Sequence, residues 1–116
     1  MLKQTLNTFL VINGAQAAMV VEENGEIIES IKSEIIIDKN NIVTIISTVM
    51  LDSKATALRF GGAPLSMVFV EYFDNFIILG PIAEEFFSII IAKNTANIGQ
   101  ITYEMKKNQE DIASEL

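Results

Sequence analysis

The chain has 116 residues, enough for one domain (1–116), and half of its residues are hydrophobic. Its net charge of −7 repels phosphate backbones and anionic membrane surfaces, so direct nucleic-acid binding is disfavoured. The absence of cysteine and histidine excludes disulfides, thiolate zinc sites, thiol nucleophiles and the commonest general base. Because so short and apolar a chain must bury most of its apolar surface, the composition also favours association with another chain.

No segment has the pattern of a membrane span or a signal peptide. The densest apolar stretch, 86–92, is much shorter than the roughly 20 residues that a spanning helix needs, and Ser88 interrupts it. The first residues lack the continuous apolar core of a signal peptide. We therefore expect a cytoplasmic protein without direct membrane insertion.

The first predicted element is a short amphipathic helix. Leu2, Leu6, Phe9 and Leu10 recur at helical spacing. Gly14 fits the left-handed position at which helices commonly end.

A β-hairpin is predicted next. Asn24-Gly25 separates two apolar-rich runs, 15–23 and 26–33, and this dipeptide is typical of a two-residue type I′ turn. The first run lacks clean alternation, which indicates a central strand covered on both faces. The second run is more polar and is predicted to be an edge strand.

The long segment 38–59 is predicted to be the central helix. Asp38 is a suitable N-cap, and Gly61-Gly62 ends the helix. Many β-branched residues make a strand the competing interpretation, but the segment is too long for one strand and lacks turn residues. The apolar side chains cover roughly 160° of the helix, whereas packing on one sheet face needs only about 100°. Since Leu51 and Leu58 lie outside even that arc, we expect a second surface to cover this helix.

Three strands and a helix complete the chain. Strands are predicted at 64–73, 76–82 and 86–92, joined by short turns at Asp74-Asn75 and Glu84-Glu85 that allow only antiparallel neighbours. A helix over 93–116 follows, with Asn94 or Thr95 as its cap. Pro81 removes one ladder donor, which predicts a bulge or an edge position. The order α-β-β-α-β-β-β-α predicts a three-layer α/β/α sandwich around a five-stranded antiparallel sheet.

This order resembles the roadblock / dynein light chain (Roadblock/LC7) family, which has a profilin-like α/β/α fold. Four stretches carry the resemblance: NGAQAAMVVEENGEIIES (13–30), the long helix from Asp38, VFVEYFDNFIILGPI (68–82) and NTANIGQITYEMKK (94–107). In the last stretch, Ala96-Asn97-Ile98-Gly99 is similar to the small-Asn-apolar-Gly segment that commonly opens the final helix in the family. The resemblance extends over essentially the whole chain.

The resemblance implies a homodimer, or a heterodimer with a related roadblock protein. Helices 38–59 of the two subunits would lie side by side, and strands 64–73 would join edge to edge. The residues expected at this interface are Ile42, Ile45, Ile46, Val49, Met50, Met67, Phe69 and Glu71.

The family also implies a function. Its members commonly serve as scaffolds or activating partners for small Ras-like GTPases, so we expect a GTPase-binding regulator without an active site of its own. The alternative is a non-catalytic structural subunit of a larger trafficking, motor or signalling complex. The expected partner contacts are Lys39, Asn40, Thr44, Asp52, Lys54 and Arg59.

No residue pattern predicts catalysis, a metal site or a bound cofactor. Glu84-Glu85 is better explained as a solvated turn, because neighbouring strand residues point to opposite faces. Arg59, the chain's single arginine, has two interpretations: an arginine finger supplied to a GTPase, or a helix-terminal cation favoured by the macrodipole, which we weigh more heavily. A small-molecule sensor, with its ligand between sheet and helix, is a third hypothesis.

Overall fold

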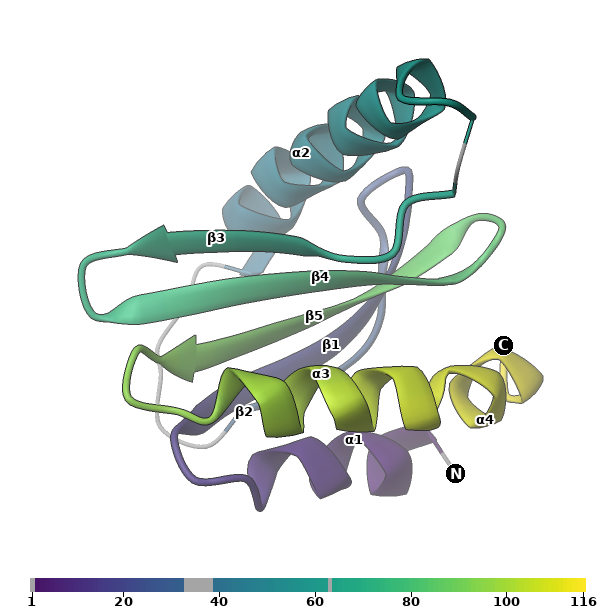
Figure 1. Ribbon diagram of the computed structural model, residues 1–116. Coiled ribbons are helices and arrows are strands. Elements are labelled where there is room, and N and C mark those ends of the chain that lie inside the picture. Colours follow the sequence, from purple (N-terminus) through teal and green to yellow (C-terminus); the bar gives the residue numbers. More distant parts are fainter. Residues whose placement is uncertain (1, 33–38, 63) are drawn as a thin grey trace.

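The computed structural model describes residues 2–32, 39–62 and 64–116, within which nine elements follow one another (Figure 1). Their bounds are α1 Leu2–Leu10, β1 Ala15–Glu22, β2 Ile27–Lys32, α2 Lys39–Arg59, β3 Val68–Tyr72, β4 Asn75–Ala83, β5 Phe86–Lys93, α3 Ile98–Lys107 and α4 Gln109–Ser114. The predicted order is confirmed, except that the last helix is divided in two. The predicted N-cap of α2, Asp38, lies outside the described residues.

The five strands form one antiparallel sheet in the order β2-β1-β5-β4-β3. β1 is therefore central and β2 lies at an edge, as predicted. β3 occupies the opposite edge, and no described strand pairs with its outer side.

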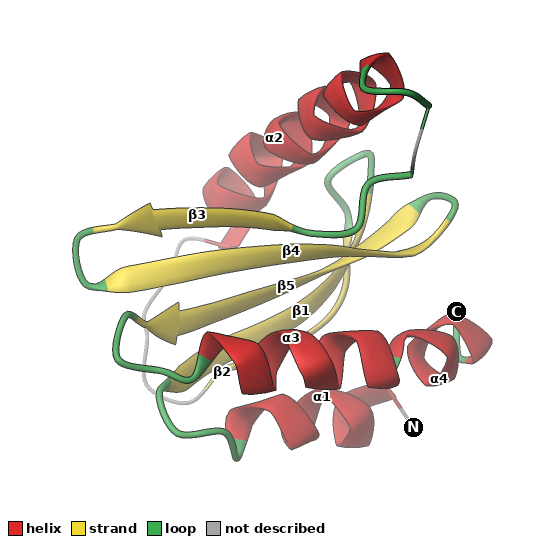
Figure 2. Cartoon of the chain, in the orientation of Figure 1, coloured by secondary structure: helices red, strands yellow, loops and turns green. Residues whose placement is uncertain are grey.

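Helices cover both faces of this sheet (Figure 2). α1, α3 and α4 lie on one face, and α2 lies on the other. The alternation along β1 shows the division, since Ala18 and Val20 pack toward α1 and α3 while Met19 and Val21 pack toward α2. The predicted three-layer α/β/α sandwich is confirmed.

The β1–β2 hairpin has a longer turn than predicted. The Glu22 N–H donates to the Glu26 carbonyl at 2.9 Å, so three residues form the loop. Gly25 has φ +97, whereas Asn24 does not have the positive φ that a type I′ turn requires. The Asn24 side chain instead accepts a hydrogen bond from the Glu26 N–H at 2.9 Å, which fixes the turn locally.

The β3–β4 hairpin also differs in register from the prediction. β3 begins at Val68 and not at Pro64, and Tyr72 pairs with Asn75, so the turn residues are Phe73 and Asp74. Phe73 has φ +47, in the left-handed region. A pattern of apolar residues could not reveal this turn, because its first residue is itself a large apolar side chain.

Pro81 lies where the sheet tolerates a missing donor. The register of β4 against β5 shifts between Pro81 and Ala83, and the pairing of β4 with β3 extends only to Leu79. The bulge predicted from the sequence is therefore confirmed.

The last helix begins later than predicted, because Lys93 still belongs to β5. The Asn97 side chain accepts from the Gln100 N–H at 3.0 Å, so Asn97, and not Asn94 or Thr95, is the N-cap of α3. Asn108 interrupts the helix, with its side-chain amide donating to the Glu104 carbonyl at 2.8 Å. The Asn108 N–H donates to the same carbonyl at 3.0 Å, and the division between α3 and α4 falls at this residue.

Gly14 has the positive φ that was predicted, at +92, but it leads into β1 four residues after α1 ends. A Cβ at this position would lie 2.8 Å from Ala96 Cβ. Gly14 therefore also allows the loop before α3 to approach the start of the sheet closely.

Candidate dimerisation and partner-binding surface

Helix α2 is buried along only part of its length. Among its described side chains the buried ones are Val43, Ile46, Ser47 and Met50, at the i, i+3, i+4, i+7 spacing that places them on one face. After Met50, none of its described side chains is buried. In Figure 1 the second half of α2 rises away from the sheet.

This second half carries two exposed stripes. Leu51 and Leu58 are 46% and 66% exposed and lie seven residues apart, so they point in one direction. Asp52 and Arg59 are exposed at the same spacing and form a polar stripe beside them. Asp52 also borders β3, so we call Leu51, Leu58 and Arg59 the outer face of α2.

The edge strand β3 adds exposed apolar surface at this edge of the sheet. Phe69 and Val70 are 50% and 36% exposed on a strand whose outer side has no described partner. A groove of about 640 Å³ runs between α2 and β3. It is lined by Val49, Asp52, Ser53, Thr56, Ala57, Leu65, Met67, Val68 and Phe69.

The predicted dimer-interface residues fall into three groups. Val49, Met67, Phe69 and Glu71 lie on or beside the groove and the β3 edge and retain solvent exposure. Ile46 and Met50 are buried beneath α2 against the chain's own sheet, so they contribute no free surface. The sequence wheel could not separate these two groups, because it shows which side chains are apolar but not which direction faces the sheet. The side chains of Ile42 and Ile45 lie outside the described part.

The predicted partner contacts are also divided. Thr44, Asp52 and Arg59 are exposed on α2. Lys54 instead forms an ion pair with Glu23, which ties the helix to the β1–β2 turn. The side chains of Lys39 and Asn40 are not among those described.

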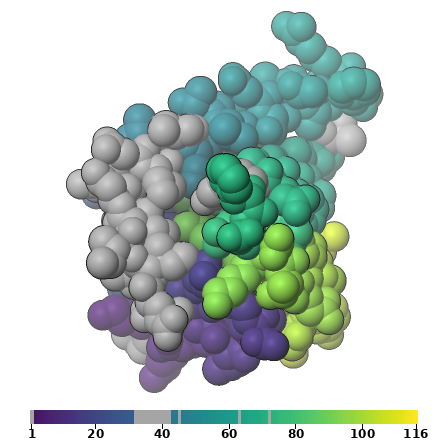
Figure 3. Space-filling view, turned by 90° about the vertical axis from the view of Figure 1, so that its left-hand side faces the viewer, coloured from purple at the N-terminus to yellow at the C-terminus, as the bar shows by residue number. Residues whose placement is uncertain are grey.

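Two exposed aromatic residues were not predicted as contacts. Phe60 follows α2 and is 81% exposed, and Phe73 at the β3–β4 turn is 95% exposed. Figure 3 shows this hairpin, in teal-green, standing forward between α2 and the light-green start of α3. The available signal was an aromatic residue beside Asp74-Asn75, where turns normally carry polar side chains.

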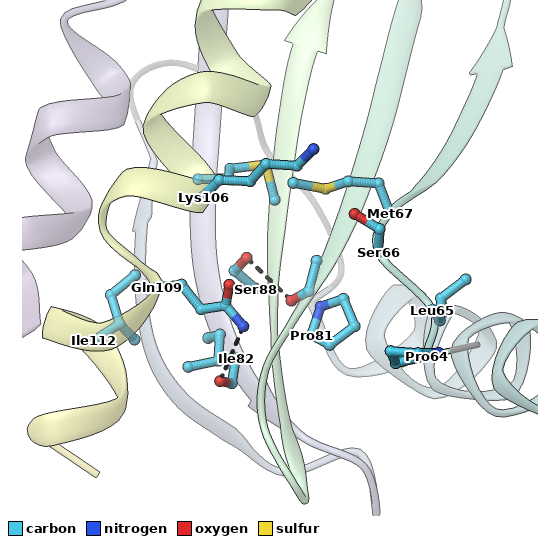
Figure 4. Close-up of a pocket in the computed structure, with 12 residues that line it drawn as sticks. Pro64, Leu65, Ser66, Met67, Pro81, Ile82, Ser88, Lys106, Gln109 and Ile112 are labelled. Atoms are coloured by element: carbon cyan, nitrogen blue, oxygen red, sulfur yellow. Dashed lines mark hydrogen bonds between the residues drawn. The ribbon is translucent and has the colours of Figure 1, made fainter. Parts of the chain in front are cut away.

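A second hollow, of about 490 Å³, lies on the opposite face, between the segment before β3 and helices α3 and α4 (Figure 4). Met67 and Lys106 extend toward one another across one end of it. Deeper in, the Ser88 hydroxyl donates to the Gly80 carbonyl at 3.3 Å, and Gln109 donates to the Ile82 carbonyl at 3.4 Å. We call this hollow the α3-side cavity.

The described residues contain no cluster of three or more acidic side chains that could hold a metal ion. No helix among them is both long enough and apolar enough to cross a membrane.

Comparison with solved structures identifies the fold. A Roadblock/LC7 domain from Streptomyces avermitilis superimposes with a TM-score of 0.87 at 13% sequence identity, over 97% of this chain and 94% of that one. The chain therefore has the Roadblock/LC7 fold, as the sequence resemblance implied. Sequence models of protein families and curated protein sequences give no match.

Two further similar structures are of the protein MglB. MglB from Myxococcus xanthus has a TM-score of 0.87 at 16% identity, covering 99% of this chain and 96% of that one. A second structure, of MglB in a tetrameric arrangement, has a TM-score of 0.88 at 16% identity, covering 97% and 85%.

Proposed function

We propose that two copies of this chain pair through β3 and the groove-facing side of α2, and that the outer face of α2 then binds a small Ras-like GTPase. The observation that carries the proposal is the coincidence of a strand edge that pairs with no described strand and a helix whose second half is uncovered. An apolar, unpaired edge is an aggregation hazard unless another strand covers it. Pairing with a second β3 covers that edge and the groove together.

The two roles use different sides of α2. Val49, Ser53 and Thr56 line the groove and would lie at the dimer interface. Leu51 and Leu58 are directed away from those residues, so they stay accessible when two copies pair. An apolar pair beside charged residues is the usual composition of a binding surface with a polar rim.

The GTPase part rests on the roadblock resemblance of the sequence and on the shared fold. The chain would act as a scaffold or regulator, without contributing an active site. Arg59 is exposed on the outer face and can contact the GTPase either as a rim charge or as an arginine finger. Arg59→Ala separates these roles, since loss of a finger slows stimulated hydrolysis by about 10³-fold or more while binding is largely kept.

The first experiment measures the mass of the free protein in solution. We expect a dimer, and we expect Val70→Lys to make it a monomer because the new charge is buried at the paired edge. The matched control is Ile28→Lys on the other edge strand, where Ile28 has a similar exposure of 39%. A monomeric wild type, or a dimer disrupted equally by both substitutions, overturns pairing through β3.

The second experiment is co-elution with Ras-like GTPases from the same source, loaded with GDP or a GTP analogue. We expect two copies per GTPase, and loss of the complex in Leu51→Ser/Leu58→Ser with the dimer intact, because neither leucine lines the groove. Tyr103→Ser, at a residue on α3 that is 62% exposed, is the control that should retain binding. A dimer that binds neither nucleotide form favours the alternative, a structural subunit of a larger complex.

A further inference from the structure

The tip of the β3–β4 hairpin holds an aromatic side chain in solvent. Phe73 is 95% exposed and has φ +47, a conformation that residues bearing large side chains rarely adopt. Two hydrogen bonds fix it there. The Asn94 N–H donates to the Asp74 carbonyl at 2.7 Å, and the Asn94 side-chain amide donates to the Phe73 carbonyl at 3.4 Å. The tip is therefore a preorganised apolar projection.

The α3-side cavity is a recess, and its lining suits an aromatic side chain. It is walled by Met67, Pro81 and Met105, with Lys106 at its rim (Figure 4). Gly80 forms part of its floor, where an added Cβ would lie 3.0 Å from Met105 Cε and 3.3 Å from Met67 Sδ. Methionine sulfurs make favourable contacts with aromatic rings and adapt readily to an inserted group. At about 490 Å³ the cavity has room for one phenyl ring.

Pairing through β3 would bring these two features together. The strand Val68–Tyr72 is centred on Val70, so two antiparallel copies overlap fully when Val70 faces Val70. Phe73 of one copy then lies opposite Met67 of the other. A register centred on Glu71 is disfavoured, because it places two carboxylates directly opposite each other.

The direction of the side chains agrees with this pairing. Phe69 and Glu71 pair with Ile78 and Phe76, which pack on the α1 and α3 side of the sheet. Met67 packs against the same core, so the odd-numbered positions here face the cavity side. Phe73 follows this series in the turn, where φ +47 takes it out of the strand alternation, so its place opposite Met67 in the paired register is what brings it beside the cavity.

We propose that Phe73 of each copy inserts into the α3-side cavity of the other, so that the dimer is locked by two exchanged aromatic anchors. This rests on the proposed pairing through β3. The occupant is therefore a second copy of this chain, and the cavity is complete only in the dimer. A desolvated aromatic anchor in a pocket is the usual form of an interface hot spot.

The test exploits the absence of native cysteine. Chains carrying Phe73→Cys are mixed with chains carrying Ser66→Cys, an exposed residue that lines the cavity, and are oxidised. Val70→Cys alone reports on β3 pairing, since opposed Cα atoms about 4.5–5.5 Å apart can form a disulfide. We expect the mixture to yield covalent dimers that neither of its components yields alone. Cross-linking of Val70→Cys without cross-linking of the mixture overturns the anchor while leaving the proposed dimer intact, whereas a monomeric wild type overturns both.

The dimer dissociation constant provides a second test, which does not depend on the distance between the two introduced cysteines. Phe73→Gly removes the anchor and relieves the backbone, so the fold is retained while the dimer dissociation constant rises about 30-fold or more. Lys106→Trp should weaken the dimer similarly by filling the cavity. The control is Lys107→Trp, because Lys107 lies instead over the Tyr103 ring, outside the cavity lining. Unchanged dissociation constants for Phe73→Gly and Lys106→Trp overturn the proposal.

Discussion

The two helical layers of this small domain differ in how far their apolar side chains are buried. On the α1 and α3 side, side chains from both helices are completely covered, including Leu6, Phe9 and Ile101. On the α2 side, burial ends at Met50 and the remaining turns of the helix keep apolar residues in solvent. The core beneath α1 and α3 is covered by the chain itself, whereas the second half of α2 leaves apolar surface that a partner can cover.

This difference separates fold stability from association. Exposed apolar surface that is contiguous with an unpaired strand edge is costly in a monomer and useful in an interface. Substitutions in the two layers should therefore differ in kind. Those beneath α1 and α3 should destabilise the chain at any protein concentration, whereas those along β3 and α2 should act through the dimer.

The largest expected effect lies in the complete layer. Phe9→Ala leaves a cavity at a side chain with no solvent exposure, so we expect a loss of about 3–5 kcal/mol in the free energy of unfolding. Val11→Ala, at a residue 83% exposed, should change it by less than about 0.5 kcal/mol. Urea unfolding at two protein concentrations measures both variants. A small loss for Phe9→Ala, or one that depends strongly on concentration, would contradict the assignment of this layer to the fold alone.

A smaller loss is expected at the junction of β1 with the loop before α3. Gly14→Ala combines an unfavourable φ of +92 with a Cβ 2.8 Å from Ala96 Cβ, whereas Gly61→Ala combines a φ of +91 with open space. The backbone term is about 1–2 kcal/mol for each. Overpacking should add about 1–3 kcal/mol to the loss for Gly14→Ala alone. Equal losses of thermal stability for the two variants would show that the close approach costs nothing.

On the α2 side one substitution should stabilise the chain. Among the described side chains, the Ser47 hydroxyl is buried without a hydrogen-bond partner. Ser47→Ala removes that unsatisfied group and improves helix propensity, so we expect a gain of about 1 kcal/mol in chemical denaturation. Ser88→Ala is the control, because the Ser88 hydroxyl donates to the Gly80 carbonyl and its removal should not stabilise. A loss in Ser47→Ala would mean that this hydroxyl is satisfied in solution.

The layers and the order of the elements along the chain could be predicted from the sequence, because they follow from long hydrophobic runs and short connections. The two-sided burial of β1 and the bulge at Pro81 are examples, whereas the pairing of β1 with β5 was not predicted. The predictions that were wrong concern a helix cap and a turn, whose positions depend on local hydrogen bonds and contacts. Asn97 caps α3 next to the close contact between Ala96 and Gly14, and the Asn94 side chain donates to the carbonyl of the turn residue Phe73.

The surface was less predictable than the fold. The width of the apolar stripe on α2 correctly indicated an excess of apolar surface, but it could not show that Ile46 and Met50 face the sheet while Leu51 and Leu58 face solvent. Nor could it show that Lys54 is engaged with Glu23. Both depend on how the helix is rotated against the sheet, which is a property of packing and not of periodicity.

The smallest expected effect concerns that ion pair, which joins the uncovered half of α2 to the β1–β2 turn. The Lys54 and Glu23 side chains are 29% and 24% exposed, so solvent screens their attraction and the pair should contribute only about 0–1 kcal/mol. A double-mutant cycle with Lys54→Met and Glu23→Gln, measured at low and high salt, isolates this coupling. We expect it to fall with salt, because a partly exposed pair is screened. A coupling much above 1 kcal/mol that is insensitive to salt would mean that the ion pair fixes the second half of α2 within the single chain. The position of that half would then depend less on the dimer than the difference in burial between the two layers implies.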